Sequence, residues 1–87
     1  MSPFLRDENG HVAMTDGEKD WLVIVTKEAL KAISIPPLAD QQRLISHLPS
    51  FIEIALFKLE HGRAGEEDTI WIQTDDIQDW RQARTQG

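Results

Sequence analysis

The sequence contains no cysteine and no tyrosine, and its 87 residues include no long apolar run. Without cysteine the chain can form neither a disulfide framework nor a thiolate metal site, which favours a reducing compartment. The longest apolar stretch, residues 21–25, is far too short to span a bilayer, and residues 1–9 lack the apolar run of a signal peptide. We therefore predict a cytoplasmic protein without a membrane partner.

Basic residues are also scarce, since 9 Lys and Arg face 15 Asp and Glu and give a net charge of −6. Affinity for nucleic acid comes largely from Lys and Arg that neutralise phosphates, so this balance disfavours a nucleic-acid partner. Arg81 and Arg84 beside Trp80 make a small basic patch, and we interpret it as favourable charge at the end of a helix.

The length supports one hydrophobic core and leaves no room for a second domain. We predict a single domain over residues 1–87. Within it, residues 1–8 form either a strand or a loose arm, and residues 85–87 form a frayed tail.

Turn and strand signals predict a small sheet. Asn9-Gly10 and Asp16-Gly17 favour tight hairpin turns on either side of a short segment. Residues 20–26 are rich in β-branched and aromatic side chains and apolar on both faces, which predicts a central strand covered on both sides. Residues 69–74 alternate and predict the last strand. We expect an α+β fold whose antiparallel sheet consists of a β-hairpin plus a later strand.

Short helices are expected to flank this sheet. Thr26 can cap a helix over residues 27–33, and Pro36-Pro37 would end it. Thr74 can cap a last helix whose first turn is acidic, which suits the positive end of the helix.

A long helix is expected over residues 38–61, with Gly62 in position to end it. Pro49 interrupts this helix and predicts either a kink or two helices that abut near His47. The expected inner stripe, which would pack on the sheet, consists of Leu38, Ile45, Leu48, Ile52, Ala55, Leu56 and Leu59.

The order of these features resembles a known family. The segments V-T-K-E-A-L, I-A-L-F-K-L-E-H-G-R and T-I-W-I-Q-T-D-D-I, with an acidic turn and an acidic loop, are similar to small bacterial proteins catalogued as domain of unknown function fourteen-eighty-eight. The resemblance covers residues 16–77, and Pro49 departs from the family's continuous helix. It implies a small α+β domain without an assigned activity or catalytic residues.

Constellations typical of catalysis or metal binding are not found in the sequence. His47 and His61 would lie about 21 Å apart on one continuous helix and could not share a metal. Residues 66–68 lack the pattern of a calcium loop, and no serine has a G-x-S-x-G context. Glu53 is the one polar residue within residues 51–57 but has no visible partner. We predict no enzyme, metal or cofactor, and a small enzyme that uses Glu53 or a histidine is kept as a third hypothesis, ahead of direct nucleic-acid binding.

A second apolar row on the long helix suggests an interaction surface. Either this chain covers Ile54 and Phe57, or a partner does. Our leading hypothesis is a non-catalytic protein-interaction or regulatory module that binds a protein partner or forms a two-fold homodimer. Its interaction surface would comprise Ile54, Phe57, His61 and Trp80. The alternative is an acidic decoy that inhibits a basic nucleic-acid-binding surface through its charge.

Overall fold

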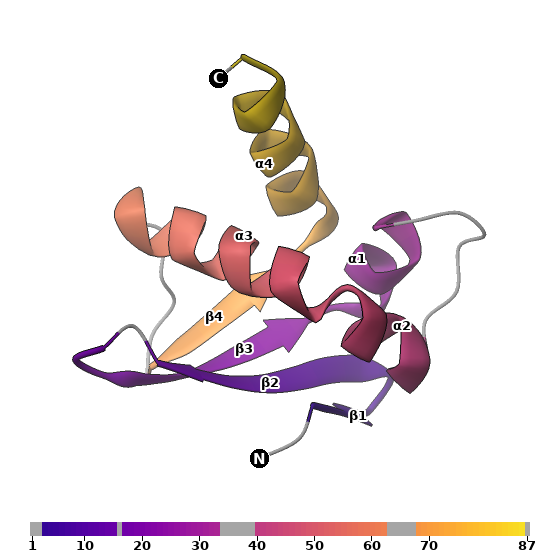
Figure 1. Ribbon diagram of the computed structural model, residues 1–87. Coiled ribbons are helices and arrows are strands. Elements are labelled where there is room, and N and C mark those ends of the chain that lie inside the picture. Colours follow the sequence, from indigo (N-terminus) through magenta and orange to yellow (C-terminus); the bar gives the residue numbers. More distant parts are fainter. Residues whose placement is uncertain (1–2, 16, 34–39, 63–67, 87) are drawn as a thin grey trace.

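The computed structural model describes residues 3–15, 17–33, 40–62 and 68–86. Three strands come first, then three helices, then one more strand and helix. They are β1 (Phe4–Arg6), β2 (Asn9–Thr15), β3 (Asp20–Val25), α1 (Lys27–Ala32), α2 (Gln41–Ser46), α3 (Leu48–Glu60), β4 (Thr69–Ile72) and α4 (Thr74–Gln86). The strands form one sheet in the order β1-β2-β3-β4, and the helices of the described residues lie on one side of it (Figure 1). The predicted α+β class is confirmed.

Several predictions fall outside the described residues. These are the end of the first helix at residues 34–37, Leu38 in the expected stripe, Asp16 in the second turn, and residues 63–67 of the acidic loop. The N-terminal alternatives are settled for residues 4–6, which form a strand rather than a loose arm. At the other end, α4 continues to Gln86, into the tail that was expected to fray.

The sheet is mixed, so the prediction of a wholly antiparallel sheet is wrong for its last strand. β1, β2 and β3 follow one another as antiparallel neighbours. β4 runs parallel to β3, with Ile70 opposite Val23 and Ile72 opposite Val25. Three helices carry the chain back across the sheet between these strands, and such a crossover returns it in the same direction.

The first turn lies two residues earlier than the predicted Asn9-Gly10 turn. Asp7 and Glu8 adopt the positive φ angles of 53° and 69° that a tight hairpin turn requires. Asn9 belongs to β2, and its Oδ1 accepts a hydrogen bond from the Lys27 N–H at 3.1 Å. The Asn side chain thus joins the start of β2 to the start of α1 instead of forming a turn.

The predicted long helix is two helices that meet at His47, which was one of the two alternatives. The His47 N–H donates to the Arg43 carbonyl of α2, and the His47 carbonyl accepts from the Phe51 N–H of α3, both at 3.1 Å. Pro49 lies in the first turn of α3. A helix needs no N–H donor there, so the proline begins a helix rather than breaking one.

The break changes which face of α3 is buried. The stripe was predicted for one continuous helix, and a new helix that starts after His47 does not keep that phase. Within the predicted stripe, Ile45 and Leu56 are exposed. Ala55 of the predicted stripe is buried, and the other buried residues of α3 are Phe51, Ile54 and Lys58, which the stripe did not include.

One of the two predicted caps is observed. Thr26 Oγ1 accepts from the Ala29 N–H at 3.2 Å and caps α1 as predicted. Thr74 is not a cap, because it is already the first residue of α4. The Asp76 carboxylate reaches back instead and accepts from the Gln73 N–H at 2.9 Å.

The hydrophobic core fills the space between the sheet and the helices. β3 is central, as predicted, but within the described residues the helices cover only one of its two faces (Figure 1). The largest fully buried side chains of this core are Phe51, Leu30, Leu44, Ile54, Ile70, Ile72, Ile77, Val23 and Val25.

Gly10 provides a test of how α2 packs on β2. A Cβ at Gly10 would lie 2.8 Å from Leu44 Cδ1, so Gly10→Ala forces the leucine to move. We expect Gly10→Ala to lower the free energy of unfolding by about 1–2 kcal/mol, measured by urea denaturation. In a Leu44→Ala background the same change should be neutral or stabilising, because alanine restricts the unfolded chain more than glycine does. Equal losses in both backgrounds would contradict the contact.

Candidate functional site

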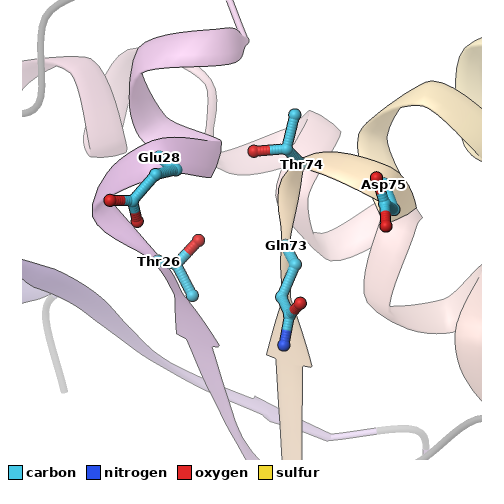
Figure 2. A pocket seen from close by; sticks show the side chains of 5 residues that line it. All are labelled: Thr26, Glu28, Gln73, Thr74 and Asp75. Carbon is cyan, nitrogen blue, oxygen red and sulfur yellow. The ribbon is translucent and has the colours of Figure 1, made fainter.

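The first candidate is a crevice where β3 and β4 end side by side. It has a volume of about 380 Å³ and is lined by Thr26 and Glu28 on one flank and by Gln73, Thr74 and Asp75 on the other (Figure 2). Ligands of open α/β sheets commonly bind outside the carboxyl ends of parallel strands, so this location merits attention.

The chemistry of the crevice argues against an anion site. Glu28 and Asp75 lie in the first turns of α1 and α4, where their carboxylates already complement the positive helix ends. Figure 2 shows these carboxylates on opposite flanks of the crevice. The Thr26 hydroxyl is occupied, since it caps α1 and donates to the Ile72 carbonyl at 3.3 Å.

A second candidate is a groove between α3 and α4, with a volume of about 330 Å³. We call it the α3–α4 groove, and it is lined by Glu53, Leu56, Phe57, Glu60, Trp80, Ala83 and Arg84. The four residues from α3 are spaced i, i+3, i+4 and i+7, so they form one row along that helix.

The floor of the α3–α4 groove is apolar. Leu56 keeps 38 % of its surface exposed, and the neighbouring Phe57 is half-buried. Trp80 forms the α4 side, where the Arg84 guanidinium lies 4.7 Å from the centre of the indole ring. Such a stacked cation covers an aromatic face and contributes about 0.5–1 kcal/mol where solvent reaches it.

The structure separates the four predicted interaction residues into two pairs. Ile54 is fully buried and Trp80 is almost so, and this chain covers both. Phe57 and His61 lie together on the surface side of α3. Their ring centres are 4.3 Å apart, and His61 Nδ1 is 2.8 Å from the Phe57 carbonyl. Phe57 and Trp80 both line the α3–α4 groove, while His61 follows the end of α3.

A buried ion pair lies behind this groove, at the junction of α3, β4 and α4. Lys58 Nζ is 3.0 Å from Asp76 Oδ2, and both side chains are close to fully buried. Lys58 Nζ also donates to the Trp71 carbonyl. The same Asp76 oxygen accepts from the Gln73 N–H. One lysine and one aspartate therefore join two helices to the strand between them.

The pair also closes the outer edge of β4. The Asp68 and Ile72 carbonyls accept hydrogen bonds from the Leu22 and Thr26 N–H groups. The backbone N–H and C=O groups of the even-numbered residues of β4 therefore point toward β3. The backbone groups of Trp71 and Gln73 then point away from the sheet. Because Lys58 and Asp76 bind two of them, this edge offers fewer free groups to an added strand.

Sequence reasoning missed Lys58 and Asp76. The helical spacing of the sequence does indicate that Lys58 is buried, because Lys58 lies four residues after Ile54 and three after Ala55, on the same face of the helix. A cation in a buried row needs a buried anion, and Asp76 follows the strand that lies beside it.

The two arginines of the basic patch near the C-terminus, Arg81 and Arg84, make different contacts. Arg81 Nη2 donates to the Ile33 and Ala32 carbonyls, at 2.7 and 3.3 Å, and so caps the end of α1. Arg84 stacks on Trp80 in the groove.

Two findings concern metals and membranes. In the part of the chain that the structure describes, no three His, Asp or Glu side chains come close enough together to hold a metal ion. Among the same residues, no helix has the length and apolar content that crossing a bilayer requires.

Comparisons with protein-family models, with curated proteins and with solved structures find no match to this chain. The resemblance to the small bacterial family stays a prediction.

Arg81 and Arg84 provide a matched pair of variants. Arg81→Met removes two hydrogen bonds at the end of α1, and we expect a loss of about 1 kcal/mol in the free energy of unfolding. Arg84→Met removes the stacking of an exposed guanidinium on the Trp80 ring, and its loss should be about half as large. Denaturant titration of both variants checks this order, and a larger loss for Arg84→Met would contradict the capping role of Arg81.

Proposed function

We propose that this chain is a non-catalytic protein-interaction module whose α3–α4 groove binds a basic amphipathic segment of a partner protein. The observation that carries the proposal is Leu56, a large apolar side chain left exposed next to Phe57 in a groove with acidic side chains along one wall. The absence of cysteine suits a cytoplasmic setting for this activity.

The apolar floor of the groove supports an amphipathic helix as the bound element. Amphipathic helices bind in grooves through apolar anchors at i, i+3, i+4 and i+7. The floor offers Leu56 and Phe57 on the α3 side, and the nearly buried Trp80 lies on the α4 side. Aromatic side chains in such a pocket supply much of the binding energy of an interface.

The charges of the groove support a basic partner. Glu53 and Glu60 lie one helical turn before and one after the apolar pair, so both carboxylates can meet Lys or Arg side chains that flank an apolar anchor. Arg84 is turned onto the Trp80 ring on the opposite wall. The net charge of −6 would steer a basic segment toward the molecule at low ionic strength.

The same acidic wall favours a second candidate function. If the basic segment belongs to a nucleic-acid-binding surface, occupying it would make this chain an acidic inhibitor of that surface. Competition with duplex DNA for the partner distinguishes this function from simple assembly, because a decoy must release the duplex.

A designed peptide tests the groove directly. The probe is a synthetic helix of leucine and lysine, with leucine at i, i+3, i+4 and i+7, and its control carries glutamate in place of lysine. We expect saturable binding of the lysine peptide in fluorescence anisotropy, with NMR amide shifts concentrated in α3 and α4. Binding should weaken as salt is added, because exposed charges contribute to it.

Two variants that replace an exposed apolar residue with serine test where the peptide binds. Leu56→Ser should weaken binding about fivefold or more, which corresponds to roughly 1 kcal/mol. Ile45→Ser on α2 is the matched control, since Ile45 is 50 % exposed and lies outside the groove. Equal binding of the glutamate peptide, or equal effects of the two variants, would contradict the proposal.

A further inference from the structure

We propose that a second copy of this chain packs against the face of the sheet that the helices leave open. This contact is independent of the α3–α4 groove, because it uses other residues on another side of the molecule. We call this surface the open sheet face.

Strand registers show which residues share the open sheet face. Alternate residues of a strand point to opposite sides, and the core side chains identify the side of the helices. Phe4 is opposite His11, His11 is opposite Ile24, and Ile24 is opposite Trp71. One row of four aromatic or apolar side chains therefore crosses all four strands.

Two observations show that side chains in this row are packed. The Phe4 and His11 rings stack, with centres 5.2 Å apart and planes within 9° of parallel. Ile24 is only 7 % exposed although it lies outside the core cluster of the helix side. Trp71, at the end of the row, keeps 43 % of its surface exposed. A packed row that ends in an exposed indole is typical of an interface.

The neighbouring row continues the apolar surface. Leu22 is opposite Ala13 on one side and Thr69 on the other, and none of the three is charged. No helix of the described residues lies on this side of the sheet (Figure 1). Uncovered apolar side chains in this number are unusual on a sheet face that meets water, where polar residues are the rule.

The open sheet face has few charged residues, and their positions would allow opposite charges to pair between two copies of the chain. Among the strand residues that alternation places there, the two charged ones are Arg6 in β1 and Asp20 in β3. They lie at opposite ends of the strands, about 20 Å apart at roughly 3.3 Å per residue. A two-fold axis that lies in this face and passes through its centre can place each Arg6 next to the partner copy's Asp20.

The same symmetry accounts for the exposed indole. If the face is treated as a flat grid with rows about 3.3 Å apart and strands about 4.8 Å apart, that axis passes close to Ile24 and Trp71. Each Trp71 then meets the Trp71 of the second copy, which is the geometry of an isologous contact. Four charged residues near the ends of the strands form two ion pairs, Lys19 with Asp68 and Lys27 with Glu8.

The size of the face sets the expected strength. The strands are only 3 to 7 residues long, and at about 4.8 Å between strands and about 3.3 Å per residue they cover roughly 300 Å², which is below the ~800 Å² per partner of a standard stable interface. We therefore expect a weak dimer that forms reversibly between micromolar and millimolar concentrations. Because each copy carries a charge of −6, added salt should strengthen the dimer by screening the repulsion.

Analytical ultracentrifugation of the whole chain tests the proposal. The average mass should rise from the monomer value of 9.9 kDa toward twice that value as concentration increases. Trp71→Thr keeps a strand-forming residue, and it should weaken the dimer about tenfold or more. Leu56→Thr is the matched control in the groove and should leave the dimer unchanged. Far-UV circular dichroism confirms that each variant folds.

A charge exchange tests the symmetry. Arg6→Asp and Asp20→Arg should each weaken the dimer, and the double variant should restore it. A wild type that stays monomeric up to millimolar concentration, a dimer lost in Leu56→Thr and kept in Trp71→Thr, or a double variant without restoration would each overturn the proposal. Peptide binding at the groove is measured separately and weakens with salt, so failure of one proposal does not imply failure of the other.

Discussion

The buried ion pair between Lys58 and Asp76 is the interaction on which the second half of the structure depends. Lys58 lies in the buried row of α3, Asp76 in the first turn of α4, and the Trp71 carbonyl of β4 lies between them. Two charges removed from water are stable only when each is paired and hydrogen-bonded. The pair therefore requires α3, β4 and α4 to keep one relative arrangement, and the groove between α3 and α4 exists only in that arrangement.

The pair also determines which surfaces remain for partners. It occupies backbone groups on the outer edge of β4, so strand addition at that edge is disfavoured. Within the described residues, the helices occupy one face of the sheet and none lies on the other (Figure 1). What remains is a groove with an acidic wall between two helices and an apolar sheet face with little charge. These surfaces differ in chemistry, which is why we propose a basic segment for one and a second copy for the other.

Local signals in the sequence predicted much of the fold, and interactions between distant residues account for the rest. The Thr26 cap, the central strand and the break at His47 follow from side-chain chemistry within a few residues. The parallel direction of β4 and the buried face of α3 depend on how the elements pack, which periodicity alone does not show. Of the four residues predicted for an interaction surface, Phe57 and Trp80 line the groove and Ile54 is fully buried, and their role in binding stays a prediction. Lys58 was missed because its partner Asp76 lies 18 positions away.

A double-mutant cycle on the ion pair tests this account most directly. Lys58→Met removes the cation, and Asp76→Asn removes the anion but retains an oxygen that can accept from the Gln73 N–H. Urea denaturation of the wild type, both single variants and the double variant gives the coupling free energy between the two residues. The account predicts a loss of about 3 kcal/mol for each single variant and a coupling of about 2 kcal/mol or more, because a lone buried charge costs more than losing both. Small, additive losses of about 0.5 kcal/mol would contradict it, since that is the behaviour of an exposed surface pair.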